Sequence, residues 1–187
     1  MENPDTRVQY TKSRFQQAIV ELLEEKAIGF VTVKELCNRA GLNRGTFYLH
    51  YTEPMDVLHE LEDRLVEMTM TGYRSNREDV LTDRLRLMLT DRKAFAAILS
   101  RNGDPAFPVR ACRLAYERVV HQEASEEKGE QEIPEEFRFI FAGCTWLIGS
   151  WLSSSDRIPP EQMARKLLLL SSGVYNSSRK QTEGGRE

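Results

Sequence analysis

The chain alternates between segments that carry apolar residues on one helical face and short polar connections. In the first such segment, residues 11–26, Phe15 and Ile19 are four positions apart within an apolar stripe. That spacing places both side chains on one face of an α-helix. We expect Thr11 to cap the start of this helix and Gly29 to lie just beyond its end.

Eight further segments show helical spacing, and none shows the strict alternation of a half-buried β-strand. They lie at residues 32–40, 44–51, 54–72, 81–89, 95–99, 109–120, 137–152 and 160–175. Between two of them, residues 123–136 carry seven glutamates and one lysine, which predicts a mobile, solvated loop. The pattern therefore predicts an all-α fold of about nine helices.

The segment from Thr32 to Tyr51 contains two short helical patterns joined by a tight turn. Thr32 and Glu35 have the spacing of a capping box at the start of the first helix. Gly41 suits the positive φ that ends that helix, and Asn43 is a favourable N-cap for the next one. This is the layout of a helix-turn-helix, whose second helix can enter the major groove of DNA.

The side chains of the second helix suit contact with DNA. Arg44 can donate to both major-groove acceptors of guanine, and Gly45 allows the helix to approach closely. Leu49 suits contact with a thymine methyl group, while the hydroxyls of Thr46 and Tyr48 suit phosphate. We therefore expect this helix both to read bases and to hold the backbone.

Residues around that helix extend the candidate interface. Thr32 and the amides after it suit a phosphate, and Lys12 and Arg14 can reach the backbone from the first helix. The full candidate set is Lys12, Arg14, Thr32, Lys34, Asn43, Arg44, Gly45, Thr46, Tyr48, Leu49, His50 and Tyr51.

Three members of this set have a second interpretation. Tyr51 also suits a packing ring at the end of the helix, His50 a structural cap, and Lys34 an ordinary solvated position. We assign Phe47 to the hydrophobic core rather than to DNA. Helix-turn-helix patterns also occur in bundles that bind no DNA, so the pattern alone leaves that alternative open.

The net charge of −3 excludes a chain that binds nucleic acid by overall basicity. The charge is uneven, however, because residues 7–52 contain seven Lys or Arg and only four acids. A basic N-terminal segment on an acidic remainder is the asymmetry expected if only that segment meets phosphate.

The remaining composition is that of a cytoplasmic protein without cofactors. Cys37, Cys112 and Cys144 each lie in an apolar helical pattern, which predicts three buried thiols rather than a metal, disulfide or redox site. No apolar run approaches the roughly 20 residues of a membrane span. The polar N-terminus lacks the apolar region of a signal peptide.

Two runs of residues resemble the DNA-binding head of the TetR (tetracycline-repressor-like) transcriptional regulators. They are Thr32-Val33-Lys34-Glu35-Leu36-Cys37 and Arg44-Gly45-Thr46-Phe47-Tyr48-Leu49-His50-Tyr51. The resemblance covers about residues 7–60. It implies an all-helical cytoplasmic homodimer with a variable ligand-binding body, in which the last two long helices form the dimer interface. It also implies phosphate contacts at Thr46, Tyr48 and His50, and base contact near Arg44 and Gly45.

The chain departs from the family at Pro54, where members often carry a lysine that touches phosphate. We therefore expect one backbone contact fewer and a weaker dependence of DNA binding on salt. Further along, residues 102–105 and 151–161 resemble the C-terminal domain of one TetR subgroup.

These observations predict a helix-turn-helix DNA-binding domain at residues 7–53 and a helical regulatory and dimerisation domain at 54–176. We expect the polar tail at 177–187 to be disordered.

The last two helices have more apolar surface than a one-sided helix needs, which predicts a homodimer, with a monomer core as the alternative. The expected interface residues are Phe141, Ile148, Trp151, Leu152, Met163, Leu167, Leu170 and Val174. The expected ligand-pocket residues, with ordinary core as the alternative, are Met68, Phe107, Tyr116, Phe137 and Trp146.

The leading hypothesis is a sequence-specific transcriptional regulator, acting as a repressor on a palindromic operator and retuned by a small-molecule effector. One alternative is a partner-binding helical adaptor. Another is a helical enzyme, for which His59 with Glu62 or Asp63 offers an acid–base pair on one helix. We predict no catalytic residues and no metal site, because the three histidines do not form a ligand set.

Overall fold

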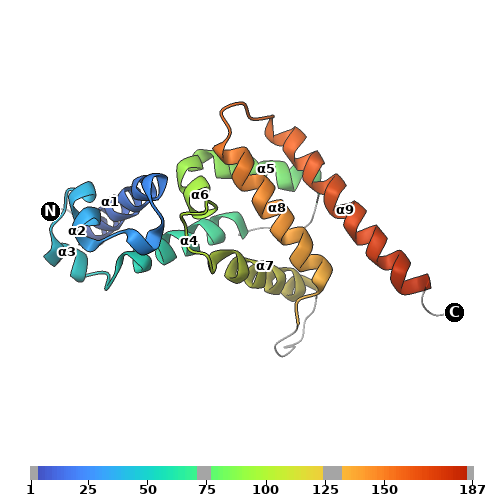
Figure 1. Ribbon diagram of the computed structural model, residues 1–187, viewed down its shortest axis with the longest axis horizontal. Helices are drawn as coiled ribbons and strands as arrows, with labels where there is room; N and C mark the ends of the chain where they lie inside the picture. The colour runs from blue at the N-terminus through green and yellow to red at the C-terminus, as the bar shows by residue number, and fades with distance from the viewer. Residues whose placement is uncertain (1–3, 71–76, 124–131, 185–187) are drawn as a thin grey trace. The chain divides into compact units, whose positions relative to one another are not determined.

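The computed structural model describes residues 4–70, 77–123 and 132–184, and within these ranges it contains nine α-helices, one short 3₁₀ helix and no strand. This confirms the predicted all-α fold (Figure 1). Residues 124–131 of the expected acidic loop lie outside the described residues. The elements are α1 (Pro4–Glu25), η1 (Ile28–Phe30), α2 (Val33–Ala40), α3 (Arg44–Tyr48), α4 (Pro54–Met70), α5 (Glu78–Thr90), α6 (Arg92–Ile98), α7 (Phe107–Glu123), α8 (Glu135–Ser153) and α9 (Pro160–Gly184).

The chain folds into two compact units. The first comprises Met1–Met68 and Lys93–Phe107, and the second comprises Thr69–Arg92 and Pro108–Glu187. The first unit therefore extends past residue 53, where the sequence pattern placed the end of the DNA-binding domain. It includes most of α4, whose Glu60 accepts hydrogen bonds from Lys12 of α1 and from Tyr51.

The first unit is built around the apolar face of α1. Phe15 and Ile19 are completely buried, and the ring of Phe15 meets the ring of Phe47 edge-on at 5.4 Å between centroids. The helix begins at Pro4, so the expected cap at Thr11 is wrong. Thr11 instead donates its hydroxyl to the carbonyl of Arg7 within the helix. Proline at the first helical turn loses no hydrogen bond, which allows this earlier start.

A second segment of the chain completes the first unit. After α6, the side chain of Asn102 donates to the carbonyl of Leu23 at 2.8 Å, and its own carbonyl accepts from the amide of Ile28 at 2.8 Å. The next residue must be small, because a Cβ on Gly103 would lie 2.8 Å from the carbonyl oxygen of Ile98. Asn102 and Gly103 thereby fasten the turn after α6 to the end of α1.

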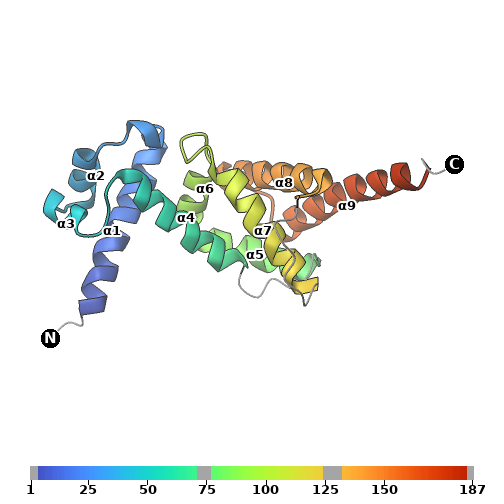
Figure 2. The same ribbon diagram turned by 90° about the horizontal axis from the view of Figure 1, so that it is seen from below.

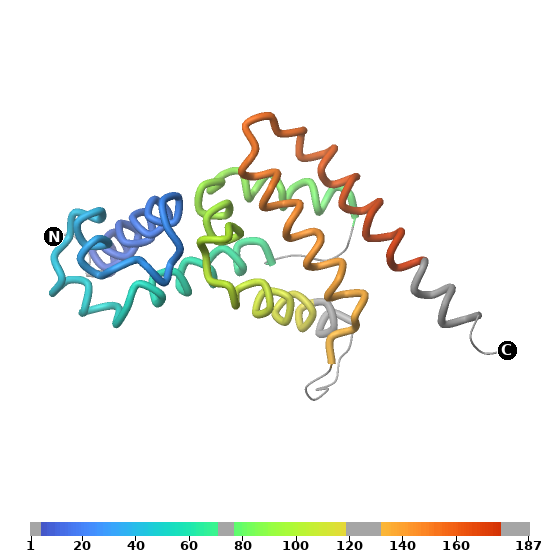
Figure 3. Tube along the Cα trace, in the orientation of Figure 1, coloured from blue at the N-terminus to red at the C-terminus, as the bar shows by residue number. Residues whose placement is uncertain are grey.

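In the second unit, α9 lies along α5 and α8 (Figures 1 and 2). Glu161 of α9 accepts from Arg86 of α5 at 2.5 Å, and Arg165 donates to Glu78 at 2.7 Å. The indole of Trp151 in α8 donates to the carbonyl of Ile158, which anchors the connection between α8 and α9. Figure 3 shows the backbone of the described part of the chain, with α5, α8 and α9, as a Cα trace.

The last helix is longer than the sequence pattern indicated. α9 continues to Gly184, so the backbone of residues 177–184 is helical where we expected a disordered tail. Its residues there are polar, but no proline interrupts them, and Arg, Lys, Gln and Glu are good helix formers. No helix in the described ranges is both long and apolar enough to cross a membrane.

Candidate nucleic-acid interface

The turn between α2 and α3 follows from three capping residues. Thr32 accepts from the amide of Glu35 and Glu35 accepts from the amide of Thr32, so the predicted capping box is present. Gly41 ends α2 with φ 70° and ψ 32°, the left-handed conformation that glycine adopts without strain. Asn43 then accepts from the amide of Thr46 at 2.8 Å and opens α3.

The helix α3 is shorter than the predicted 44–51. It ends at Tyr48, and the amide of His50 turns back to the carbonyl of Phe47, a tighter 3₁₀-type bond that closes the last turn. Phe47 is completely buried, as expected, whereas Tyr48 and Leu49 are 60% and 78% exposed.

The first turn of α3 is open to solvent. Arg44 and Gly45 are both exposed, next to the cap formed by Asn43. A Cβ on Gly45 would lie 3.2 Å from the side-chain oxygen of Asn43, so glycine also keeps the cap unstrained. The hydroxyl of Thr46 donates to the same Asn43 oxygen. In this arrangement the Thr46 hydroxyl has no proton to donate to a phosphate oxygen.

Tyr51 and Lys12 both belong to a local network around Glu60. The Tyr51 hydroxyl donates to Glu60 at 2.5 Å, and Lys12 donates to the other oxygen of Glu60 at 2.7 Å. Tyr51 is only 7% exposed, and burial followed by the Glu60 hydrogen bond raises the pKa of its hydroxyl. Burial opposes ionisation of Glu60, but the hydrogen bonds from Lys12 and Tyr51 outweigh it and lower the pKa of that carboxyl.

Arg14 also has a structural task. Its Nε and Nη2 atoms donate to the carbonyl of Ala40 at 3.1 and 2.9 Å, which caps the C-terminus of α2. The Thr32 hydroxyl is held in the capping box, although the residue is exposed. His50 is half-buried beside the exposed α3 surface.

Some basic side chains of the helix-turn-helix form ion pairs with carboxylates, and others form none with the described residues. Lys26 donates to Glu35 at 2.6 Å, and Arg39 donates to Glu25 at 2.8 Å. The hydrogen bond from Lys26, with those from Thr32, lowers the pKa of Glu35 to about 2. Lys34 and Arg44 are exposed, and neither forms an ion pair with the described residues. These two cations are therefore the ones available near α3.

The predicted dimer residues prove to be of two kinds. Trp151, Leu152, Met163 and Leu167 are at most 6% exposed, so they form the core of the second unit and their assignment to an interface is wrong. Leu170 is 49% exposed, while Phe141, Ile148 and Val174 are half-buried. The exposed apolar side chains that the sequence analysis missed on these helices are Phe139, Trp146, Leu169 and Tyr175.

The predicted ligand-pocket residues differ in burial and belong to different units. Trp146 is 71% exposed, which contradicts its placement inside a pocket. Tyr116 and Phe137 are half-buried, with ring centroids 5.2 Å apart, whereas Phe107 is buried and Met68 half-buried in the first unit. An open cleft of about 620 Å³ in the second unit has a different, charged lining. Its residues are Arg77, Glu78, Asp79, Thr82, Asp83, Arg86 and Glu161.

The cysteines follow the prediction in two of three cases. Cys37 and Cys112 are buried, whereas Cys144 is only half-buried. Burial raises the pKa of all three thiols.

Comparison with known proteins places both parts of the chain in one family. Residues 17–60 match the model of the bacterial regulatory proteins of the tetR family, and residues 75–173 match the model of a transcriptional regulator C-terminal region. A search of curated protein sequences found no match.

Solved structures share the fold over most of its length. A TetR transcriptional regulator from Streptococcus agalactiae 2603V has 24% identity and a TM-score of 0.64, over 89% of this chain and 96% of that one. The fatty acid degradation regulator FadR from Bacillus halodurans has 15% identity and a TM-score of 0.58, over 91% and 96%. NalD of Pseudomonas aeruginosa, the secondary repressor of the MexAB-OprM multidrug efflux pump, has 17% identity and a TM-score of 0.54, over 89% and 97%.

The C-terminal model covers more than half of the chain, and the N-terminal model covers α2, α3 and the turn between them. The structure gives that turn the capping residues and the exposed second helix that major-groove contact requires. The resemblance to TetR regulators is thereby confirmed, and the chain belongs to the tetR family of bacterial regulatory proteins as a DNA-binding transcriptional regulator.

Proposed function

We propose that this regulator is a cytoplasmic homodimer that binds a palindromic operator through two copies of α3 and represses transcription until a small molecule releases it. The exposed first turn of α3 carries the proposal. Arg44 is exposed on that turn and Leu49 is exposed at the C-cap of the helix, while Phe47 fixes the helix to the core. NalD, which shares the fold, is described as a repressor, and this supports the expected direction of regulation.

Within the proposed interface, bases and phosphates are contacted by different residues. Arg44 and Gly45 of α3 and the C-cap residue Leu49 are exposed and are assigned to base edges. Tyr48 and Lys34 have exposed polar ends suited to phosphate, which carries no sequence information. Lys12, Arg14 and Tyr51, engaged elsewhere, are removed from the proposed contact set.

The homodimer is supported by an exposed stripe on α8 and α9. Phe139 and Trp146 are 68% and 71% exposed and lie seven residues apart, so they share one face of α8. Between them, Gly143 has open space where a Cβ would stand, as does Gly173 of α9. Apolar rings flanking small residues allow two helices to pack closely, so a second copy of the chain would bury this stripe.

For the effector, the half-buried aromatic residues of the second unit are the proposed contact. Phe137 lies between Tyr116 and Phe141, with ring centroids at 5.2 and 6.3 Å. Aromatic surfaces of this kind commonly line sites for small apolar molecules. An effector that binds one spacing of the two α3 helices more tightly would shift the dimer towards that spacing and change its affinity for the operator.

Selection from random double-stranded DNA tests the proposal directly. The purified protein should enrich a palindrome whose half-site centres lie about 34–36 Å apart, or a multiple of that distance. The variant Arg44→Ala should lose preference at one base pair in each half-site, by a factor that corresponds to about 1–3 kcal/mol. Arg101→Ala is the matched control, because Arg101 is an exposed arginine of the turn after α6.

A phosphate contact should respond differently from a base contact. Lys34→Ala should weaken binding to all sequences about equally and reduce the slope of log affinity against log salt by about 1. If Arg44→Ala selects the same sequence with the same stringency as the unmodified protein, the assignment of α3 as the reading helix is wrong.

A further inference from the structure

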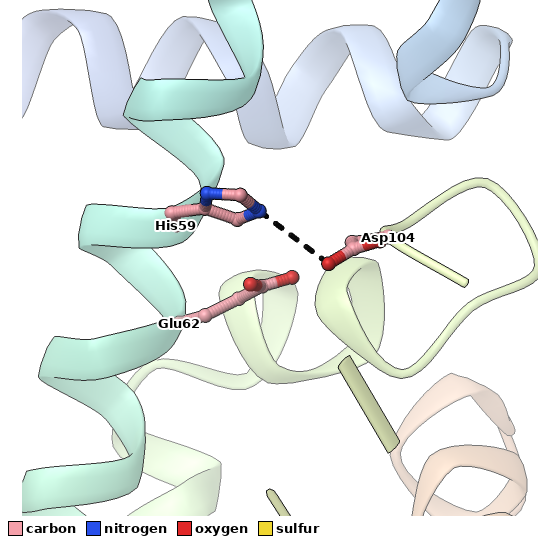
Figure 4. A group of neighbouring side chains, drawn as sticks. All are labelled: His59, Glu62 and Asp104. Carbon is pink, nitrogen blue, oxygen red and sulfur yellow. Dashed lines mark ion pairs between the residues drawn. The ribbon is translucent and has the colours of Figure 1, made fainter. Parts of the chain in front are cut away.

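Three side chains with metal-binding chemistry converge within the first unit. His59 and Glu62 lie one turn apart on α4, and Asp104 lies in the turn between α6 and α7 (Figure 4). One ligand atom from each of the three lies within 4.8 Å of the others. All three residues belong to the same compact unit, so their juxtaposition does not depend on how the two units are placed.

The burial of the three side chains is graded from the core to the surface. Glu62 is completely buried, the Asp104 side chain is 6% exposed and the His59 side chain is 44% exposed. Two carboxylates brought together away from water favour positive charge between them. A protonated imidazole supplies one such charge, whereas a divalent cation supplies two. The half-exposed His59 also gives an ion a route from solvent.

The ligand atoms are close to the arrangement that a metal ion requires. His59 Nε2 lies 3.4 Å from Asp104 Oδ2. Two atoms bound to one tetrahedral zinc ion at about 2.1 Å are separated by about 3.4 Å. The other Asp104 oxygen, Oδ1, accepts from the amide of Ala106 at 2.9 Å, which fixes the orientation of the carboxylate. All three ligand atoms lie within 4.8 Å of one another, so one ion could stand between them.

We propose that His59, Glu62 and Asp104 bind a divalent first-row transition-metal ion. The set of one imidazole nitrogen and two carboxylate oxygens favours zinc or its neighbours over Mg²⁺ and Ca²⁺, which prefer oxygen ligands only. Three protein ligands leave at least one coordination position for water. The ion would tie α4, which follows the helix-turn-helix, to the turn that begins α7. This inference does not depend on the proposed dimer, operator or effector.

The three histidines of the sequence do not form a ligand set, so the sequence pattern predicts no metal site. Only one histidine takes part here, and its second acidic partner is 45 positions away in the chain. His59 with Glu62 was visible as a pair on one helix, but the fold alone brings Asp104 to them.

Zinc titration of the chelator-treated full-length protein tests the site. Isothermal titration calorimetry with Zn²⁺ should show one ion bound per chain, and Mg²⁺ in excess should not displace it. His59→Ala should weaken Zn²⁺ binding at least tenfold, and this half-exposed position should tolerate the change. Asp63→Asn is the matched control, because Asp63 is an exposed acid next to Glu62 and should bind Zn²⁺ like the unmodified protein.

Cobalt spectroscopy identifies the ligands without any variant. Co²⁺ bound here should give the visible d–d bands of a nitrogen and oxygen site, without a thiolate charge-transfer band. The thermal midpoint should rise with Zn²⁺ in the unmodified protein and in Asp63→Asn but not in His59→Ala, since only ligand bound to the folded state stabilises it. The proposal is overturned by absence of one-to-one binding, by a thiolate band, or by unchanged affinity in folded His59→Ala.

Discussion

At the residue scale, two tyrosines near α3 show how similar side chains acquire different tasks. Tyr48 is 60% exposed, whereas Tyr51 is 7% exposed and hydrogen-bonded to Glu60. The sequence pattern does not distinguish the two, because each is aromatic, carries a hydroxyl and lies in or next to α3. Only the position of Glu60 on α4, and the ring of Phe15 beneath, decides that Tyr51 faces inwards.

Removal of the Tyr51 hydroxyl should therefore affect stability rather than DNA recognition. Tyr51→Phe leaves the half-buried Glu60 carboxylate without one charge-assisted hydrogen bond, which should lower the free energy of unfolding by about 2 kcal/mol. Urea denaturation measures this loss. Tyr48→Phe should leave the urea midpoint unchanged, and an equal loss in both variants would contradict the assignment.

The turn glycine makes a second residue-scale prediction. An alanine at Gly41 must adopt φ 70°, which should cost about 1–2 kcal/mol of stability. Gly29→Ala, where a Cβ meets nothing within 4 Å and φ is not positive, is the matched control. Thermal denaturation of both variants should show a lower unfolding midpoint for Gly41→Ala and an unchanged midpoint for Gly29→Ala.

At the element scale, local signals predicted the caps and the turn of α2 and α3 better than the extent of the long helices. The capping box at Thr32, the turn at Gly41 and the cap at Asn43 are all confirmed, because each depends on residues within three positions. The ends of α1 and α9 were wrong, because a polar segment can continue a helix that neighbouring apolar residues have already nucleated.

The capping box should also appear in the acid stability of the protein. The pKa of Glu35 is lowered from 4.5 to about 2 in the folded state, first by the hydrogen bond from Lys26. Ionised Glu35 therefore stabilises the folded chain fully above about pH 4.5, and this contribution is lost as the pH falls towards 2. Glu35→Gln should reduce stability at pH 6 and differ less from the unmodified protein as the pH approaches 2.

Unfolding midpoints measured between pH 2 and pH 6 check this dependence. Glu53→Gln is the control, because Glu53 is exposed and forms no ion pair with the described residues. A Glu35→Gln curve that stays parallel to that of the unmodified protein over the whole range would show that Glu35 is not tied to Lys26 in solution.

At the scale of the whole molecule, the sequence pattern identified α8 and α9 as strongly apolar helices but did not indicate which of their faces are buried and which are exposed. α8 is apolar on nearly every side, so its pattern cannot rank Trp151 against Trp146. The fold decides, because Trp151 is enclosed by the connection to α9 while Trp146 is exposed. The same limit applies to Asp104, whose partners on α4 become apparent only in the folded chain.

A charge placed on the exposed stripe should separate the proposed dimer. Trp146→Glu should give a monomer of 21.6 kDa by size-exclusion chromatography with light scattering, and should bind a palindromic operator at least tenfold more weakly. Val109→Glu is the matched control, since Val109 is 73% exposed on α7 and away from the stripe. A Trp146→Glu protein that remains dimeric would show that the copies associate elsewhere.

The turn fastened by Asn102 and Gly103 has a consequence for synthesis on the ribosome. Because Lys93–Phe107 belongs to the first unit, that unit is complete only after residue 107 has left the exit tunnel. Its hydrogen bond from Asn102 to the end of α1 forms only after α5, a helix of the other unit, has been synthesised. A gene fusion that transplants only residues 1–68 onto another body would omit this closing piece. Hybrid regulators should therefore carry residues 93–107 together with the N-terminal helices.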